Sequence, residues 1–363
     1  MHFQMTGSVF HLNQSEVCPQ VNASCKAIEA IESVVVRICI SIMTSEESIA
    51  LHDLTRLHGK RTAKTCPLAS PFKLKQLAQT VYLLNVIHRL CSENRCVNQR
   101  ELFYRSLSDS IAPCFIDQNA MNRALFCLLN SIGCDRHELG IFTTARGLVA
   151  ACPDTQTLCL DSNSEFIADL SDHPDGMSIC ENLVGISTLQ TSADFILIVE
   201  KDTVFQSLLS SENFFQYNAC ILVTARGYPD NITIRFLKRL QQVLNDKVPF
   251  LYLGDLDPHG ISIALVYNRA LNGAINWIGL HHSDISSLDH QRVLGIKMKP
   301  SDMALLNSLI EQPTTPANFR SELAKIESVG MKYEIECLHS VSEQYIATTW
   351  LPRKTASVLN FSN

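Results

Sequence analysis

The second half of the chain alternates between short apolar runs and segments with helical spacing. Helical spacing occurs near 203–209, at 231–244 and at 261–271, and each of these segments lies between two apolar runs. The apolar runs are DFILIV (194–199), ACILVT (219–224), VPFLYLG (248–254) and AINWIGL (274–280). Continuously apolar strands separated by helices are typical of a parallel sheet buried on both faces. The pattern therefore predicts an α/β domain whose ligands bind at the carboxyl ends of the strands.

The part of the chain before this domain has the spacing of helices. A first helix is predicted over 73–90. Asn98 is predicted to cap a second helix, and Glu101, three residues later, would complete a capping box. A third helix is predicted from about 119 to 131, ending at Gly133. The apolar stripe of the first helix consists of Leu74, Leu77, Val81, Leu84 and Ile87.

The segment LGIFTTARGLVAAC (139–152) is predicted to form two short strands around Ala145, Arg146 and Gly147. Helices followed by a small hairpin are typical of a winged-helix module. Such modules usually bind nucleic acid through their third helix.

These patterns divide the chain into four predicted parts. Residues 1–71 form an N-terminal extension, in which Ala27 to Ser48 is expected to be a helix that docks on a partner. Residues 72–152 form the winged-helix module, 153–190 connect, and 191–363 form the α/β domain with a C-terminal elaboration.

Composition is that of a globular protein. Of 363 residues, 46% are apolar and 18% are charged. The longest apolar run of the first half, near 34–43, is interrupted by Arg37 and is too short to span a bilayer, so no membrane partner is expected. The fourteen cysteines are scattered, with no CxxC pair, and we interpret them as reduced thiols of a cytosolic or nuclear protein.

Charge is distributed unevenly along the chain. The net charge of −6 argues weakly against DNA binding. However, the segment from Asp53 to Arg105 holds ten Lys and Arg residues against three Asp and Glu residues, a net charge of +7. Such a segment can bind phosphates, although a solvated basic face explains the charge equally well.

Acidic residues follow two of the predicted strands. Glu200 follows the first strand, and Asp255 and Asp257 follow the third, just before Pro258 and Gly260. Carboxylates held together repel each other unless a cation offsets their charge, and oxygen-only ligands suit Mg²⁺. Glu200, Asp255 and Asp257 are therefore candidate Mg²⁺ ligands. An Asp-x-Asp pair alone is more often a turn former or a helix cap.

Two neighbours of these acids have other uses. Asp202 is more readily explained as the cap of the following helix, and His259 as a turn residue or a neighbour of the ligands.

The segment QRELFYRS (99–106) holds a candidate nucleophile. Tyr104 follows Arg100 by one helical turn, which brings their side chains to about 6 Å at Cβ. A guanidinium favours the phenolate form and binds phosphate oxygens. An interfacial tyrosine beside an arginine whose charge reaches solvent is the alternative.

Four segments together resemble one family. RELFY (100–104) resembles the Arg-Asp-x-(Phe/Tyr)-Tyr motif of the A subunit of topoisomerase VI and its eukaryotic relatives, the meiotic double-strand-break transesterases. VEKD (199–202), ARGYPD (225–230) and GDLDPHGI (254–261) resemble the family's Val-Glu-Lys-Asp, Gly-Lys-Gly-x-Pro-Asp and Asp-x-Asp-Pro-(His/Tyr)-Gly segments. The resemblance covers roughly residues 70–355. Departures from the family pattern are Glu101 for the usual Asp, Phe103 for the Tyr of many members, and Arg146 and Arg226 where Lys is frequent.

The resemblance implies a fold and a mechanism. The fold would be a multidomain α/β protein, with a winged-helix (CAP-like) DNA-binding domain followed by a parallel α/β Toprim domain. Tyr104, beside the motif's Arg100, would attack a DNA phosphate and form a 5′-phosphotyrosyl link. Glu200, Asp255 and Asp257 would bind Mg²⁺. The enzyme would be a type II topoisomerase-like transesterase of the isomerase class.

The resemblance also implies partners. Double-stranded DNA would be cut by a homodimer whose active sites are shared between chains. A topoisomerase VI B-like protein and other meiotic proteins are the expected partners, and the nucleus is the expected location. The long N-terminal region and the many cysteines favour a meiotic protein that initiates recombination.

Other functions remain open from the sequence. A topoisomerase VI A subunit would relax DNA with an ATPase partner. A non-catalytic winged-helix protein would bind DNA without cleaving it. A different Toprim enzyme, a nuclease or primase, would use water or a nucleotide instead of Tyr104.

Overall fold

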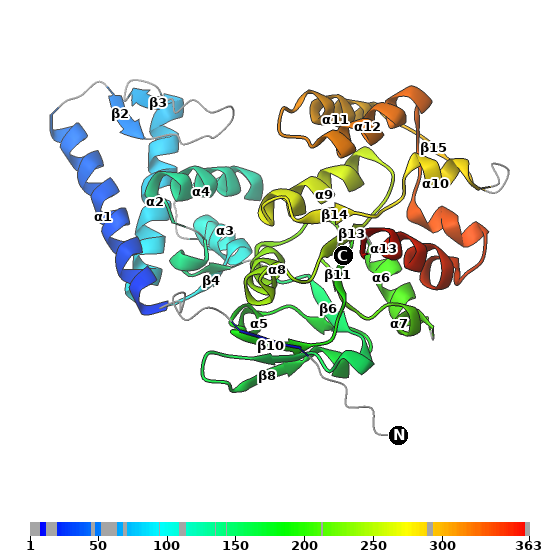
Figure 1. Ribbon diagram of the computed structural model, residues 1–363. Coiled ribbons are helices and arrows are strands. Elements are labelled where there is room, and N and C mark those ends of the chain that lie inside the picture. The colour runs from blue at the N-terminus through cyan, green and yellow to red at the C-terminus, as the bar shows by residue number, and fades with distance from the viewer. Residues whose placement is uncertain are drawn as a thin grey trace. The chain divides into compact units, whose positions relative to one another are not determined.

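The computed structural model describes most of the chain and divides it into two compact units. The described residues are 8–11, 20–44, 48–51, 64–67, 71–93, 95–108, 114–134, 136–142, 144–211, 213–288 and 293–359. We call Val17–Thr144 the helical unit, and Met1–Glu16 together with Ala145–Asn363 the sheet unit. Figure 1 shows their elements. None of the described helices combines the length and apolar character needed to cross a membrane.

The described residues of the helical unit form four α-helices and short strand pairs. Its helices are α1 (Gln20–Met43), α2 (Pro71–Ser92), α3 (Gln99–Ser108) and α4 (Gln118–Ile132), and its strands are β2 (Ser48–Leu51), β3 (Lys64–Pro67), β4 (Val97–Asn98) and β5 (Ile141–Phe142). β2 pairs with β3 antiparallel, and β4 with β5 parallel. The three helices predicted between 73 and 131 are confirmed.

Local signals at the helix ends are confirmed in part. The Arg100 amide donates to Asn98 Oδ1 at 2.9 Å, so Asn98 caps α3 as predicted. Gly133, at φ 71°, ends α4. The predicted capping box is wrong, because Glu101 Oε1 accepts instead from Arg105 Nη2 at 2.6 Å.

The apolar stripe of α2 differs from the predicted one. Leu84 and Ile87 are buried, but Leu74 and Val81 are 47% and 45% exposed. The buried stripe consists of Leu83, Leu84, Ile87, Leu90 and Cys91. This stripe faces α1 and α4, which α2 contacts, so the contact partners rather than the spacing alone select the buried face.

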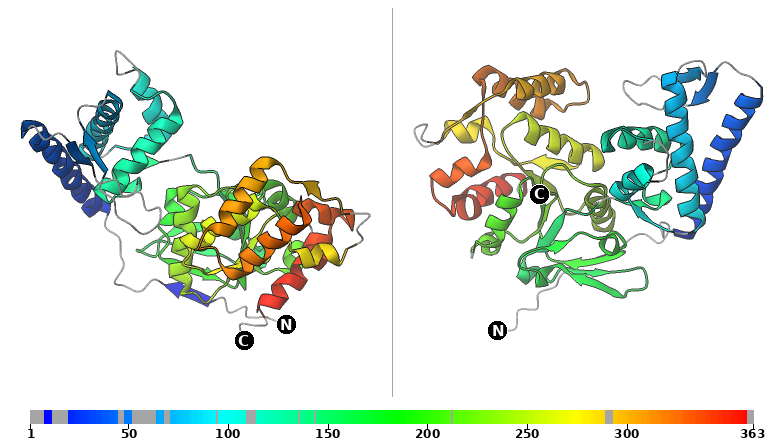
Figure 2. Two further views of the ribbon diagram at one scale, coloured as in Figure 1. Left: turned by 90° about the horizontal axis from the view of Figure 1, so that it is seen from above. Right: turned by 180° about the vertical axis from the view of Figure 1, so that it is seen from behind.

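Helix α1 packs within its own unit. Its inner face places Ala27, Ile31 and Val34 in the same core as α2, beside which it runs (Figures 1 and 2). Val36 and Ile40 on its outer face are more than half exposed. The predicted docking of this helix on a partner stays a prediction, and it concerns this outer face only.

The sheet unit is centred on a six-stranded sheet in the order β14-β13-β11-β12-β6-β9. Its strands are β6 (Leu148–Ala151), β9 (Met177–Ser178), β11 (Phe195–Val199), β12 (Cys220–Thr224), β13 (Phe250–Leu253) and β14 (Ile275–Trp277). The four strands predicted after residue 190 are confirmed, and they run parallel to one another. All residues of β11, β12 and β13 are buried, as expected when both faces of a sheet are covered.

Helices cover both faces of this sheet. Their bounds are α6 (Asp202–Leu209), α7 (Phe214–Tyr217), α8 (Asn231–Leu244) and α9 (Pro258–Ala270). α8 and α9 contact each other, and α6 contacts β11 and β12. Right-handed crossovers place α6 on the face opposite α8 and α9 (Figure 1).

The hairpin predicted over 139–152 is wrong. β5 pairs with β4 in the helical unit, whereas β6 pairs antiparallel with β12 in the sheet unit. The change of unit falls between Thr144 and Ala145. All four residues of β6 are buried, which fits a strand inside a covered sheet and not a wing with one face in water.

Further elements surround the sheet. A second, antiparallel sheet has the order β1-β10-β7-β8, formed by β1 (Ser8–His11), β7 (Leu158–Leu160), β8 (Phe166–Asp169) and β10 (Thr188–Thr191). The remaining helices and strands are α5 (Glu181–Val184), α10 (His282–Ser286), α11 (Pro300–Glu311), α12 (Ala317–Val329), α13 (Leu351–Leu359), β15 (Ile296–Lys297) and β16 (Met331–Lys332). A 3₁₀ segment (Ile335–Ser340) and a π-helix (Ile346–Trp350) precede α13.

Candidate metal centre and candidate nucleophile

The strand register brings the predicted acids to one edge of the main sheet. Val199 at the end of β11 lies opposite Leu253 of β13 and Thr224 of β12. Glu200 directly follows β11, and Asp255 and Asp257 follow β13. We call Glu200, Asp255 and Asp257 the acidic edge. All three are less than 10% exposed.

Glu200 points into the space between β13 and the start of α9. Its Oε2 accepts from the Asp255 amide at 3.1 Å and from the Tyr252 hydroxyl at 3.2 Å. A Cβ added at Gly254 or Gly260 would lie 2.5 or 2.8 Å from this oxygen. Glycine at both positions therefore leaves the room that the carboxylate occupies.

Asp255 has a partner for each carboxylate oxygen. Oδ1 accepts from the Ile335 amide at 2.9 Å. Oδ2 lies 2.9 Å from Lys201 Nζ. The side chain is thus held by a segment 80 residues later and by the lysine next to Glu200.

Asp257 caps α9. Its Oδ1 accepts from the Gly260 amide at 2.6 Å, and its Oδ2 lies 4.0 Å from Lys332 Nζ. The cap starts α9 at Pro258, three residues before the Ile261 expected from the sequence. The alternative interpretation of the Asp-x-Asp pair as a helix cap is therefore correct for Asp257, which caps α9 through its Oδ1.

The acidic edge is electrostatically strained. Burial, followed by the charges of Asp255 and Asp257, raises the pKa of Glu200 well above its ordinary value. Burial also raises the pKa of Asp255, although Lys201 opposes this change. Like charges held out of water favour protonation unless a cation is near.

The donor chemistry of the acidic edge fits a divalent cation, although its oxygens do not yet form a ligand set. Among the described residues, no group of three or more His, Cys, Asp or Glu side chains has the arrangement of a metal site. A cation is nevertheless accommodated there, because the Lys201 ammonium contacts Asp255. Buried carboxylate oxygens match the preference of hard divalent cations for oxygen ligands.

The sequence did not single out the basic and acidic residues around this edge. Lys201 Nζ also lies 2.7 Å from Glu336 Oε2 and 3.5 Å from Glu334 Oε2. Lys332 Nζ lies 3.0 Å from Asp302 Oδ2. Lys201 belongs to the VEKD motif. The other residues come from two segments that no motif marked, and only the tertiary fold brings them here.

Neither alternative ligand contacts the acids. Asp202 Oδ1 lies 3.1 Å from Arg226 Nε, and His259 Nε2 lies 3.3 Å from Asp302 Oδ1. The expected cap at Asp202 is wrong, because Asp202 is the first residue of α6 and Lys201 is the N-cap residue. Arg226 itself adopts φ 60° in the turn after β12. That turn is also bound by Arg146, whose Nη2 donates to the Tyr228 carbonyl at 3.2 Å.

Tyr104 lies on the exposed face of α3, in the helical unit. Its side chain is 64% exposed, and Arg100 is exposed one turn earlier. The Arg100 guanidinium has no hydrogen bond or ion pair with another residue that the structure describes. The candidate nucleophile is therefore accessible.

The opposite face of α3 is anchored by a polar network that sequence reasoning missed. Gln99, only 7% exposed, donates to Asn122 Oδ1 of α4 and accepts from Arg136 Nη1 at 2.8 Å. Leu102 is fully buried below it. Gln99 directly precedes the RELFY motif, and this position was the only feature of the sequence that could have marked it as an anchoring residue.

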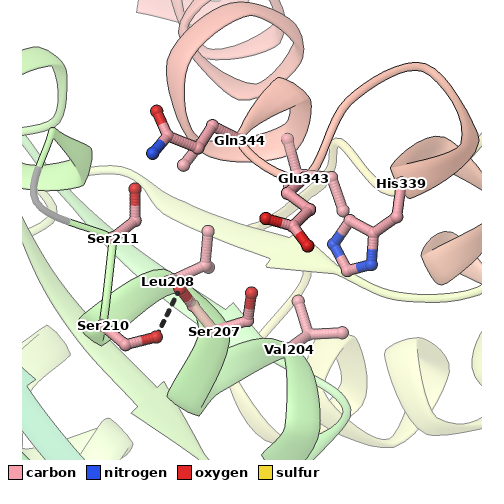
Figure 3. A pocket seen from close by; sticks show the side chains of 10 residues that line it. Val204, Ser207, Leu208, Ser210, Ser211, His339, Glu343 and Gln344 are labelled. Atoms are coloured by element: carbon pink, nitrogen blue, oxygen red, sulfur yellow. Dashed lines mark hydrogen bonds between the residues drawn. The ribbon is translucent and has the colours of Figure 1, made fainter.

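A cavity of about 360 Å³ opens beside α6, apart from these residues. Figure 3 shows Ser207, Ser210 and Ser211 on one side and His339 and Glu343 on the other. None of the five residues predicted as catalytic or metal-binding lines it.

Comparison with known proteins identifies the family. Residues 195–355 match the model of the Toprim domain shared by Spo11 and the topoisomerase 6 A subunit, and residues 75–141 match "Type IIB DNA topoisomerase". "Meiotic recombination protein SPO11-2" of Oryza sativa subsp. indica is 30% identical over 271 residues, which are 71% of this chain and 68% of the relative. The A subunit of DNA topoisomerase 6 of Arabidopsis thaliana is 28% identical over 349 residues, or 89% of this chain and 79% of the relative.

A third relative, "Meiotic recombination protein SPO11" of Homo sapiens, is 28% identical over 326 residues, or 85% of this chain and 77% of the relative. The matched regions contain the acidic edge and Tyr104. The chain belongs to the family formed by Spo11 and the topoisomerase 6 A subunit.

Proposed function

We propose that this protein is a DNA-cleaving transesterase of the topoisomerase VI A type that makes meiotic double-strand breaks and so initiates recombination. The observation that carries the proposal is the group of buried, mutually repelling carboxylates at the end of the sheet, inside the region that matches the Toprim model. Named relatives that act in meiotic recombination support the meiotic role.

In the proposed reaction, the Tyr104 oxygen attacks a backbone phosphorus of DNA. The P–O bond to the sugar 3′ oxygen breaks, that oxygen leaves as a 3′-hydroxyl after taking up a proton, and a 5′-phosphotyrosyl ester forms. One phosphodiester replaces another, so cleavage itself needs no nucleotide hydrolysis. Arg100, exposed one turn from Tyr104, would bind a phosphate oxygen. The enzyme would thus be a type II topoisomerase-like member of the isomerase class.

Glu200, Asp255 and Asp257 are the residues that we propose to hold Mg²⁺. The ion would supply positive charge that stabilises the phosphate in the transition state. The burial of all three side chains and the raised pKa values of Glu200 and Asp255 support this assignment, because a dication would relieve the repulsion that the fold imposes.

The helical unit would bind double-stranded DNA as a winged-helix (CAP-like) domain. Counted from α2, α4 is the third helix of this unit. It exposes Asn119, Arg123 and Phe126 and has no acidic residue along its length. A helix face of this composition suits the phosphates and groove of DNA. Of the basic segment, residues 53–63, 68–70 and 94 lie outside the described residues.

Tyr104 and the acidic edge belong to different units of the chain. We propose that they form shared sites in a homodimer, with Tyr104 of one chain beside the metal ligands of the other. Two such sites would cut both strands. A topoisomerase VI B-like protein and other meiotic proteins are the proposed partners, and the nucleus is the proposed location.

The test replaces Tyr104 with Phe. Tyr104→Phe should abolish covalent protein–DNA complexes while DNA binding is retained, because only the nucleophilic oxygen is lost. Tyr217→Phe is the matched control, since Tyr217 is similarly exposed, at 58%, and lies on α7 of the sheet unit. Mass spectrometry of the trapped complex should find the nucleotide on Tyr104. Covalent adducts formed by Tyr104→Phe would refute the assignment.

A topoisomerase VI A subunit is the second candidate, favoured by the Arabidopsis relative that matches 89% of this chain. It predicts ATP-dependent relaxation of supercoiled DNA when a B-type partner is added. The proposed break-forming enzyme predicts persistent breaks with covalently bound protein.

A further inference from the structure

Of the basic side chains that the structure describes, Lys201 makes the shortest ion pair with the acidic edge. Its Nζ lies 2.9 Å from Asp255 Oδ2, 2.7 Å from Glu336 Oε2 and 3.5 Å from Glu334 Oε2. An ammonium group has three N–H donors, so one lysine can serve this whole set of carboxylates. Lys201 therefore stands where a cation is needed in the absence of a metal ion.

Backbone contacts hold together the two chain segments whose carboxylates Lys201 contacts. Leu256 and Tyr333 form an antiparallel bridge, with amide-to-carbonyl distances of 3.0 and 3.1 Å. The Ile335 amide then binds Asp255 Oδ1. The segment that carries Glu334 and Glu336 is thus held beside Asp255 independently of Lys201.

The two carboxylates closest to Lys201 have different second partners. Asp255 Oδ1 is occupied by the Ile335 amide, so Oδ2, the oxygen that Lys201 contacts, is the one left for a metal ion. Glu336 Oε1 accepts from Thr203 Oγ1 at 3.3 Å, so this carboxylate is oriented toward Lys201 from outside the acidic edge. A dication and an ammonium on the same oxygen would repel each other strongly in a partly buried place.

We propose that Lys201 is an exchangeable internal cation of the acidic edge. It neutralises Asp255 before metal binding, competes with the divalent ion for Asp255 Oδ2, and remains on Glu336 when the ion enters. The inference rests on the proposed function, which assigns Asp255 to the metal. Glu336 is an anchor in this scheme and acts through Lys201.

Lys332 provides an internal contrast. It lies 4.0 Å from Asp257 Oδ2 but 3.0 Å from Asp302 Oδ2, so it is already anchored away from the acidic edge. Competition with the metal ion is therefore assigned to Lys201 and not to every lysine nearby.

The experiment measures Mn²⁺ binding to the full chain by calorimetry and by electron paramagnetic resonance, with Mg²⁺ as competitor and without DNA. Lys201→Met should tighten Mn²⁺ binding about tenfold, because the competitor is removed. Glu336→Gln should weaken binding about threefold, because Lys201 then depends more on Asp255. The double variant should behave like Lys201→Met, since Glu336 acts only through the lysine.

A purely structural role of Lys201 would give a different pattern of metal binding and stability. If Lys201 only held the 334–336 segment in place, both single variants would weaken metal binding and lower the melting temperature. Unchanged or weakened binding in Lys201→Met overturns the proposal. If Lys201→Met fails to fold, as thermal unfolding in EDTA would show, Glu336→Gln decides alone. Weaker binding at an unchanged melting temperature then supports the proposal, and unchanged or tighter binding, or a lowered melting temperature, overturns it.

Two further variants separate this inference from the proposed function. Lys325→Met removes a lysine paired with Glu322 at 2.6 Å and should leave Mn²⁺ binding unchanged. Asp255→Asn should abolish Mn²⁺ binding. If it does not, the metal assignment itself is wrong. If Asp255→Asn abolishes binding while Lys201→Met leaves it unchanged, only the competition is wrong.

Discussion

The acidic edge and the exposed face of α3 hold their reactive groups in opposite ways. At the acidic edge, Glu200 and Asp255 are buried and each accepts hydrogen bonds from its own chain. On α3, Tyr104 is 64% exposed, and Arg100 has no side-chain partner among the described residues. The first region is arranged by folding, whereas the second presents groups for another molecule. Under the proposed function, the acidic edge is therefore preformed by folding, whereas Tyr104 would be positioned by DNA and a partner chain.

The strongest way to break this comparison is to remove one buried acid. Asp255→Asn should lower the rate of covalent complex formation by about 10³-fold, the scale of losing one charge-stabilising group. DNA binding should be retained, because the proposed DNA-binding helix lies in the other unit. A gel assay for covalent complexes and a filter-binding assay give the two measurements. Asp246→Asn, at an exposed position two residues after α8, is the matched control. Cleavage by Asp255→Asn at more than a tenth of the normal rate would contradict the role of the acidic edge.

The second test uses the pH dependence of stability in EDTA. The pKa of Glu200 is raised to about 8 by burial and by Asp255, from 4.5. The native state therefore binds more protons than the unfolded state between these values, and stability falls as pH rises through this window. Glu200→Gln should remove the penalty and stabilise the chain at pH 8.5 by about 2 kcal/mol, with little effect at pH 4.5.

Urea unfolding at the two pH values measures this difference. Glu327→Gln, an exposed position on α12, should show no such pH-dependent gain. Saturating Mg²⁺ should raise the melting temperature of the unmodified chain and not that of Glu200→Gln. If Glu200→Gln is destabilised equally at both pH values, Glu200 is not strained by charge.

The third test concerns the anchored face of α3. Gln99→Ala should cost about 1–3 kcal/mol of stability, because it leaves the partly buried Arg136 guanidinium without its 2.8 Å acceptor. Covalent complex formation should fall because α3 carries Tyr104, while Mn²⁺ binding should be unchanged. Thermal unfolding and calorimetry measure these effects. Asn119→Ala, an exposed position on α4, is the control for stability. A loss of Mn²⁺ affinity in Gln99→Ala would contradict the independence of the two regions.

Sequence patterns predicted the main sheet well because its signals are local. β11, β12 and β13 are continuous apolar runs, and residues that follow parallel strands must meet at one edge. Glu200 and Asp255 could therefore be placed together from the order of strands along the chain. The predicted hairpin at 139–152 was wrong because strand spacing does not identify the partner. β6 is paired by β12, which lies some 70 residues later.

Residues around the two regions could not be predicted for the same reason. Glu336 reaches Lys201 only because Tyr333, just after β16, pairs with Leu256, just after β13, and nothing local marks a glutamate as an anchor. Gln99 resembles any polar residue at a helix start until Arg136 and Asn122 are known to contact it. The sequence motifs identified the side chains that are proposed to act in the reaction. Long-range packing determined which side chains hold them.

The smallest expected effect is that of replacing Glu101, and it tests the comparison on the exposed face of α3. Glu101, where the family usually has Asp, pairs with Arg105 at 2.6 Å on a partly exposed surface. An exposed pair at this spacing contributes only about 0.3–0.5 kcal/mol, so Glu101→Gln should change stability by no more than this amount. Covalent complex formation should stay within about twofold of normal, because this carboxylate is directed to Arg105 and away from the assigned phosphate-binding groups. A tenfold loss of covalent complex without a loss of stability would show that the exposed face of α3 is already ordered for chemistry before DNA binds. The contrast between a preformed acidic edge and an incomplete nucleophile would then be wrong.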